Sequence, residues 1–490
     1  MKLIVGRKGL LIKTNGKISK RFVMLIVLAL LVLIAGIFGI MKYRDEQKAL
    51  SEKASIETKT FAYATDLDDS KETMTSVDAV VDYLTNWAKT KGVSCESDDS
   101  GNVIMDVAAA KGYKKVKPTL LVCSYSVDNF DGCIAPMSLC LYLAKNKAET
   151  GHLRILFTDN TGNNFNGIKA LDKDYISDVH NIICVNGNSN NFWSTTTGGR
   201  STYEFTKEYS TARIKTKGNK AIRITVEGLP GGIPALTYSS YPNPIKTLGN
   251  LLASFKTNAY IFKLADFHGG SSGNVLPKDA CATIVINEND YKKFTDKLDS
   301  YIEKQVSKRS EKFPDFKITY KEVKLPKRVM EQKDADEFVS VIYTLLDGVY
   351  YKNDNGDVIS STNIGCVSEA DGVYTILASA SSLEEASLTE IDNTYKTICG
   401  LSNIKYRRLG GQAKWTVEEE DTLPSKIHEA FNIYSGKNLE FSPSVAPSAA
   451  SYLRKYNVNA EIICVNLNSD RLERYTGTLL TYLKNQKPKK

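Results

Sequence analysis

The residues with the most specific chemistry in this chain of 490 residues are its four histidines and nine cysteines. Four imidazoles are few for an enzyme that relies on several histidine ligands to a metal. His152, His180 and His428 lie at the boundaries of predicted elements without the spacing of a ligand set, and His268 precedes a Gly-Gly-Ser-Ser turn. No Gly-x-Ser-x-Gly elbow or ordered set of Ser, His and Asp indicates a serine hydrolase. The sequence therefore argues against a histidine-rich metal centre and gives no support to a serine nucleophile.

Most of the cysteines lie inside apolar runs, as Cys123, Cys184 and Cys464 do. Buried thiols in strands are typical of such positions. Disulfides remain open, because spacing alone cannot pair the cysteines. The runs 182–186 and 462–466 have closely similar sequences, and both lead into Asn/Ser loops. We predict that they are two strands of one sheet, at the edge where open α/β sheets bind ligands.

Apolar runs and helical patterns alternate from residue 76 to residue 185. Continuous apolar strands between helices predict an α/β domain with a mainly parallel sheet. From residue 202 onward the strands alternate apolar and polar residues, which predicts an inserted α+β domain with a half-exposed sheet. Two further helices are predicted at 423–434 and 448–455, ahead of the apolar run at 462–466.

The positive charge of the chain is concentrated at its N-terminus. Residues 1–44 contain nine basic and no acidic residues, which leaves 55 basic against 56 acidic residues elsewhere. A basic nucleic-acid-binding protein is therefore not indicated. Residues 22–41 are uncharged and apolar, and twenty helical residues span about 30 Å, the thickness of a hydrocarbon core. Most of the basic residues precede this span, so the positive-inside rule predicts a cytoplasmic N-terminus and an extracytoplasmic C-terminal domain at the cell membrane. A cleaved signal peptide is the alternative.

The order of short motifs from about residue 75 to residue 483 resembles the aminoacyl-histidine (Xaa-His) dipeptidases, which are dizinc exopeptidases related to carnosinase and the aminoacylases. The motifs that carry the resemblance are Asp82-Tyr83-Leu84, Gly101-Asn102-Val103-Ile104, Leu156-Phe157-Thr158-Asp159-Asn160, Gly228-Leu229-Pro230-Gly231-Gly232, Gly269-Gly270 with Asn274-Val275-Leu276-Pro277, and Lys426-Ile427-His428-Glu429-Ala430. The resemblance implies a zinc-exopeptidase-like α/β fold with an inserted α+β lid domain, here preceded by one transmembrane helix.

The resemblance also implies where metal ligands would lie. The family motif Gly-His-x-Asp corresponds to 123–126, so Ser124 and Ser126 stand at its His and Asp positions. The other matches are Asp131 for the bridging aspartate, Asp159 and Asn160 for the Glu-Glu pair of general base and ligand, Asn186 for the next carboxylate ligand, the loop after Cys464 for the last histidine, and Ile233 for the lid histidine.

These replacements remove strong zinc ligands at several positions at once. Hydroxyls and amides bind zinc poorly, and two remaining carboxylates suit a harder, weakly held cation. We therefore predict no cofactor, with zinc bound only if unusual ligands rebuild the site. Asp131 and Asp159 are then expected to be structural residues, and His268 to line the former cleft or to be merely solvated. A rebuilt site that uses Cys123, Cys184 or Cys464 is the less favoured alternative.

The predicted organisation is a cytoplasmic basic tail at 1–21, a transmembrane helix at 22–41, a stalk at 42–72, a metallopeptidase-like α/β domain at 73–200 and 416–490, and an inserted lid domain at 201–415. Three functions are compatible with it. The first is a non-catalytic binding or scaffolding module, whose former cleft would hold a peptide, an amino-acid derivative or a cell-envelope component, or would pair with a protein. The second is a metal-dependent dipeptidase or aminoacylase-type hydrolase with unusual ligands. The third is a structural homodimer formed through the lid. The predicted partners also include membrane lipid around the helix, and exclude nucleic acid.

Overall fold

The computed structural model describes residues 20–490 except 147–149, 216, 235–239, 259 and 487–490. Contacts divide the chain into two compact units, Met1–Lys59 and Thr60–Lys490. The predicted basic tail at 1–21 lies almost wholly outside the described residues.

One long helix, α1 (Lys20–Ser70), contains both the predicted span and most of the predicted stalk. Its apolar part has a mean hydropathy of 3.0, and the helix is long and apolar enough to cross a membrane. Large apolar side chains such as Leu28, Val32 and Phe38 are exposed along it. A short 3₁₀ turn, Lys71–Thr73, follows the helix.

A seven-stranded sheet forms the first layer of the unit that starts at Thr60, in the order β1-β2-β4-β3-β5-β20-β6. Its strands are β1 (Ser94–Ser97), β2 (Val103–Val107), β3 (Thr119–Tyr125), β4 (Leu153–Asp159), β5 (Asn181–Gly187), β6 (Phe192–Ser194) and β20 (Glu461–Leu467). β4, β3, β5 and β20 are parallel, whereas β1, β2 and β6 are antiparallel to their neighbours. The sheet is therefore mixed, which corrects the prediction of a mainly parallel sheet. Helices connect β3, β4 and β5, as parallel strands require, whereas β1 and β2 follow each other directly and pair antiparallel.

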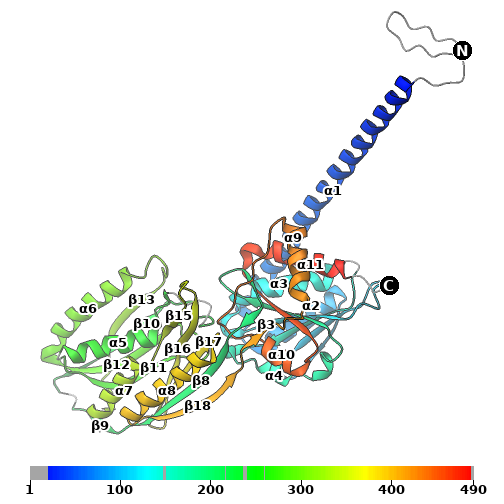
Figure 1. The fold of residues 1–490 in the computed structure, drawn as a ribbon. Helices are drawn as coiled ribbons and strands as arrows, with labels where there is room; N and C mark the ends of the chain where they lie inside the picture. Colours follow the sequence, from blue (N-terminus) through cyan, green and yellow to red (C-terminus); the bar gives the residue numbers. More distant parts are fainter. Residues whose placement is uncertain (1–19, 147–149, 216, 235–239, 259, 487–490) are drawn as a thin grey trace, which may run out of the picture. The chain divides into compact units, whose positions relative to one another are not determined.

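Residues on both faces of the central strands are buried, which explains their continuous apolar runs. Leu120, Leu121, Val122 and Cys123 of β3 are all at most 1% exposed. The helices around this sheet are α2 (Val77–Lys91), α3 (Ile134–Asn146), α4 (Asn166–Ala170), α9 (Leu423–Ser435), α10 (Ala450–Tyr456) and α11 (Leu472–Asn485) (Figure 1).

The two ends of α2 follow from the residues that flank it. The Ser76 hydroxyl accepts a hydrogen bond from the Ala79 N–H at 3.2 Å, and Gly92 follows the helix with a φ of 68°. A serine N-cap satisfies one free N–H of the first turn, and a left-handed glycine ends the helix without strain.

Residues 199–412 supply a second, nine-stranded sheet, in the order β13-β10-β12-β11-β16-β17-β8-β18 with β15 beside β16. Its strands are β8 (Gly199–Glu208), β10 (Asn219–Glu227), β11 (Lys263–Gly270), β12 (Ala280–Asn287), β13 (Lys317–Val323), β15 (Gly348–Lys352), β16 (Val358–Ala370), β17 (Val373–Ser382) and β18 (Lys405–Gln412). Two small ladders accompany the sheets, β7 (Thr196–Thr197) with β19 (Trp415–Thr416) and β9 (Thr211–Arg213) with β14 (Arg328–Met330).

Four helices cover one face of the second sheet (Figure 1). They are α5 (Pro244–Thr257), α6 (Tyr291–Ser307), α7 (Gln332–Thr344) and α8 (Glu385–Leu401). Alternate strand residues, such as Ile222 and Ile224 of β10, pack against them in one core cluster. Side chains between these positions, such as Arg223, lie on the opposite face, where the described residues form a small apolar cluster around Ala221, Val285 and Val329. This one-sided packing explains the alternating pattern of the sequence.

Candidate functional site

The register of the first sheet brings the polar ends of its parallel strands to one edge. β3 lies between β4 and β5, with Ser124 opposite Thr158 and Cys123 opposite Val185. β20 continues the series, and Asn466 lies opposite Asn186. The prediction that the two similar apolar runs are strands of one sheet is therefore confirmed, and the structure shows them as direct neighbours. The loops after these strands meet at the edge where open α/β sheets bind ligands.

A small cavity of about 50 Å³ lies at this edge, and we refer to it as the cleft. Four of the seven predicted site residues line it: Ser124, Ser126, Asn160 and Asn186. The Ser124 hydroxyl is buried without a hydrogen-bond partner among the described residues. The side-chain oxygen of Asn160 accepts from the Phe165 N–H at 2.8 Å, and its amide donates to Asn163 at 3.3 Å. Gly232, Ile233 and Val275, which belong to loops of the second sheet, complete the lining.

The other three predicted residues do not line the cleft. Asp131 is exposed in a 3₁₀ turn, and its carboxylate pairs with the Lys71 ammonium at 3.2 Å. Asp159 is buried, and its carboxylate accepts from the Thr161 N–H at 2.9 Å and from the Asn166 amide at 3.5 Å. His268 lies on β11 of the second sheet, beside Cys281.

Asp128 is the carboxylate that faces the cleft, and the sequence reasoning missed it. One oxygen of Asp128 accepts a hydrogen bond from the Gly162 N–H at 2.7 Å, which ties the turn after β4 to the turn after β3. Asp128 stands three residues before Asp131 in the sequence. The positions of these turns determine that Asp128, and not Asp131, faces the cleft. The signal that could have found it is Asp128-Asn129 directly after the end of the β3 run.

The donor atoms that face the cleft do not fit a dizinc site. Among the lining residues that the structure describes, they are hydroxyls, amides, one carboxylate and the thiol of Cys133. Burial raises the pKa of the Cys133 thiol to about 12, although the Ser126 N–H opposes the shift. A zinc pair needs thiolate, imidazole or carboxylate ligands on both ions, and one carboxylate that already holds a backbone N–H cannot supply them.

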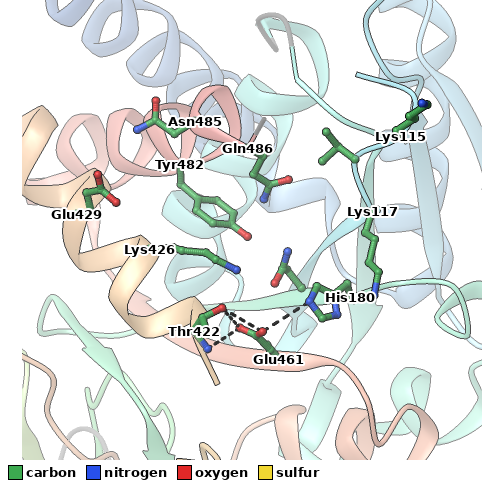
Figure 2. Close-up of a pocket in the computed structure, with 12 residues that line it drawn as sticks. Lys115, Lys117, His180, Thr422, Lys426, Glu429, Glu461, Tyr482, Asn485 and Gln486 are labelled. Carbon is green, nitrogen blue, oxygen red and sulfur yellow. Dashed lines mark hydrogen bonds and ion pairs between the residues drawn. The ribbon is translucent and has the colours of Figure 1, made fainter. Parts of the chain in front are cut away.

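A larger cavity of about 850 Å³ lies at the opposite edge of the same sheet, and we call it the amino-edge cavity (Figure 2). His180 and Asn181 at the start of β5, Glu461 at the start of β20, and Lys117 before β3 line it. Further lining residues are Lys115, Val116, Thr422, Lys426, Glu429, Tyr482, Asn485 and Gln486. This cavity was not predicted, because its side chains come from segments far apart in the sequence.

The charged groups of the amino-edge cavity differ in whether they already have partners in the structure. Glu461 accepts hydrogen bonds from the N–H and hydroxyl of Thr422 and lies 3.6 Å from the His180 ring (Figure 2). It also accepts a hydrogen bond from the Leu423 N–H. Burial lowers the pKa of His180, Lys117 and Lys426 lower it further, and Glu461 opposes the shift. Lys115, Lys117 and Lys426 form no ion pair with a residue that the structure describes. The cavity therefore holds three lysines that are available to an anion.

Comparisons with known proteins agree with the fold. The chain is 22% identical over 388 residues to the cytosol non-specific dipeptidase of Escherichia coli (strain K12), an alignment that covers 72% of this chain and 79% of the relative. The crystal structure of aminoacylhistidine dipeptidase from Vibrio alginolyticus matches with a TM-score of 0.54 at 17% identity and covers 83% of this chain and 92% of that chain. No family model matches the chain. The resemblance to the aminoacyl-histidine dipeptidase group is thereby confirmed, and the fold is an α/β peptidase-like fold with mixed sheets.

Proposed function

We propose that this dipeptidase-like chain is a membrane-anchored, extracytoplasmic binding protein that does not hydrolyse dipeptides by a dizinc mechanism. The observation that carries the proposal is the donor set of the cleft. Ser124, Ser126, Asn160 and Asn186 present hydroxyl and amide groups there, and Asp128 is the carboxylate among the lining residues. Without a metal to activate water, a carboxylate in this place has no nucleophile to serve. No cofactor is proposed for the cleft.

The competing proposal is a metal-dependent dipeptidase or aminoacylase-type hydrolase with unusual ligands. Both matched proteins are named as dipeptidases, so dipeptides are the substrates to try. The full-length chain in detergent micelles is incubated with aminoacyl-histidine dipeptides and Zn²⁺, with and without a chelator. We expect no cleavage above that of a buffer control.

Two variants make this assay decisive. Asp128→Asn changes the carboxylate of the cleft, whereas Asp131→Asn changes an exposed carboxylate outside it. Chelator-sensitive cleavage that Asp128→Asn abolishes and Asp131→Asn retains would establish the hydrolase and overturn the binding proposal.

The ligand is proposed to bind in the amino-edge cavity. Sites for small molecules usually have volumes of about 300–1,000 Å³. The amino-edge cavity has about 850 Å³, whereas the cleft has about 50 Å³. Lys117 and Lys426 would bind an anionic group, so the proposed class is an acidic peptide, an acidic amino-acid derivative or an acidic cell-envelope fragment.

A thermal-shift screen of such acidic compounds tests the binding role. A ligand at 100 times its Kd stabilises the folded chain by about 2.7 kcal/mol. The stabilisation should disappear in Lys426→Met and persist in Lys297→Met, which removes an exposed lysine of α6. A ligand effect that survives Lys426→Met but is lost in Ser124→Ala would move the site to the cleft.

Two further roles belong to the proposal. The second sheet is proposed as a lid, because its loops contribute Gly232, Ile233 and Val275 to the cleft. A homodimer through this lid is the structural alternative. Strong self-association together with no stabilising ligand in the screen would favour the structural homodimer over the binding protein.

A further inference from the structure

Three side chains with strong affinity for metals lie together on the second sheet, away from the lining of the cleft. They are Asp266 and His268 of β11 and Cys281 of β12. Among the residues that the structure describes, these form the one group of three or more His, Cys, Asp or Glu side chains with the spacing of a metal site.

Strand pairing explains why the three side chains share a face. β11 and β12 are antiparallel, and His268 lies directly opposite Cys281. A bulge between Leu264 and Asp266 shifts the register of β11, so that Phe267 enters the main core cluster while its two neighbours face the other way. Ala280 and Ala282 of β12 enter the same core cluster, which places Cys281 on the opposite face. The bulge therefore determines that Asp266, His268 and Cys281 meet.

The distances between the donor atoms suit a tetrahedral ion. Nδ1 of His268 lies 3.0 Å from an Asp266 carboxylate oxygen and 3.7 Å from the Cys281 Sγ, and Nε2 lies 3.0 Å from the same sulfur. With Zn–N and Zn–O bonds of about 2.0 Å and a Zn–S bond of about 2.3 Å, tetrahedral angles separate N from O by about 3.3 Å and N from S by about 3.6 Å. All three ligand atoms lie within 4.8 Å of one another, and a rotation of the half-exposed His268 ring would bring one ring nitrogen, the carboxylate oxygen and the sulfur around one ion.

The surroundings leave one side of the cluster open. Cys281 is 8% exposed and forms the floor, whereas the His268 side chain is 50% exposed. Arg223 is the competing cation, because its guanidinium lies 3.9 Å from the Asp266 carboxylate and also donates to the Thr283 hydroxyl at 3.4 Å. Because the 3.9 Å distance from Arg223 to Asp266 is longer than the 3.0 Å distance from His268, His268 makes the closer contact with this carboxylate.

We propose that Asp266, His268 and Cys281 bind one Zn²⁺ ion, with water as the fourth ligand. A thiolate and an imidazole favour zinc over the hard cations Mg²⁺ and Ca²⁺, and three protein ligands plus water are typical of open zinc sites. The inference is independent of the proposed function, because none of the three residues lines the cleft or the amino-edge cavity.

Metal titration of the full-length chain in detergent micelles tests the site. The metal-free, reduced chain is titrated with Zn²⁺ against a chromophoric chelator, and we expect one tight equivalent. Cys281→Ser and His268→Gln should each weaken this binding by about 100-fold or more, since each removes a protein ligand. The matched controls are His152→Gln, which alters a His–Asp pair with Asp106 that has no thiol, and Cys95→Ser, which removes a cysteine outside the cluster. Both controls and Asp128→Asn should leave the affinity unchanged.

Substitution with Co²⁺ tests the site in the unmodified chain, so the result does not depend on how well a variant folds. A thiolate ligand gives a sulfur-to-cobalt charge-transfer band in the near ultraviolet, so the unmodified chain should show this band and Zn²⁺ should displace it. Absence of the band in the unmodified chain would overturn the proposal. So would zinc affinity that Cys281→Ser and His268→Gln leave intact, or that Asp128→Asn abolishes.

Discussion

Gly187, at the end of β5, lies where the chain leaves room only for hydrogen. A Cβ atom added to it would lie 1.7 Å from the Gly132 carbonyl oxygen. That oxygen belongs to the backbone of the turn beside the cleft, so it cannot move aside as a flexible side chain could. The close approach of these two loops is one reason why the cleft is small.

Gly187→Ala is therefore expected to destabilise the fold by about 2–3 kcal/mol, because the loops around the cleft must separate. Chemical denaturation of the full-length chain in micelles measures the change. Gly400→Ala is the control, since a Cβ there meets nothing within 4 Å and α8 would gain up to about 1 kcal/mol from the better helix former. Equal effects of the two substitutions would contradict the steric argument.

Asp347 gives the stability of the second sheet a dependence on pH. Burial raises the pKa of its carboxyl from 3.8 to about 6, although the Ile364 N–H, Lys246 and Asn243 oppose the shift. Between these two values the folded chain holds a proton that the unfolded chain has lost. The stabilising, protonated state is fully present below about pH 4 and is lost as the pH rises through about 6.

Asp347→Asn removes this titration and should become more stabilising, relative to the natural chain, as the pH rises. We expect the difference in unfolding free energy to grow by roughly 1–3 kcal/mol between pH 4.5 and 7.5. Urea unfolding at the two pH values measures it, with exposed Asp354→Asn as the control. A difference that stays constant with pH would show that Asp347 does not titrate as described.

The start of α9 depends on a residue from a distant strand. Its own N-cap residue, Thr422, makes no side-chain capping bond. Glu461 of β20 instead accepts from the Thr422 N–H at 2.9 Å and from the Leu423 N–H at 2.6 Å. A carboxylate at this end also interacts favourably with the helix dipole.

Glu461→Ala should accordingly cost about 1–2 kcal/mol of stability, the range measured for the loss of a helix cap. Glu461→Gln, which can still accept hydrogen bonds, should recover part of that loss. The control is Glu429→Ala, which changes an exposed residue of α9 that also lines the amino-edge cavity. Thermal unfolding compares the three variants, and a loss in Glu429→Ala as large as that in Glu461→Ala would rule out the capping role.

Helices and strands that depend on adjacent residues could be predicted from the sequence. Contacts that depend on how two strands are aligned with each other could not. The caps of α2 and the similar runs in β5 and β20 are visible in the sequence, because helix ends and buried parallel strands depend on adjacent residues. In contrast, His268 was expected at the cleft or in solvent, and the bulge in β11 that turns it toward Cys281 has no sequence signal that we could use. Asp128 and Asp131 stand three residues apart, and only the turns after β3 decide which one faces the cleft.

At the scale of the whole chain, charge and hydropathy both distinguish the first 44 residues from the rest of the sequence. The nine basic residues of the first 44 residues flank an apolar segment, and the rest of the chain is nearly neutral. The described part of that segment is a helix with a mean hydropathy of 3.0. In water its exposed apolar side chains would be unfavourable, whereas in lipid they are not. Membrane insertion is therefore the proposed explanation for the net charge of +8.

Membrane insertion predicts how the chain fractionates. The full-length protein expressed in a bacterium should sediment with membranes, resist extraction by high salt and dissolve in detergent. Protease added outside spheroplasts should degrade the domain that starts at Thr60, because the basic tail is expected to stay inside. Leu31→Arg combined with Ile34→Asp should release the protein from the membrane, since each charge at the centre of a span costs about 2.5–3.5 kcal/mol. Leu50→Arg changes an equally exposed leucine of α1 beyond the apolar segment and should have no effect. Full release of the natural chain by high salt, or protection of the domain from external protease, would contradict the anchored topology.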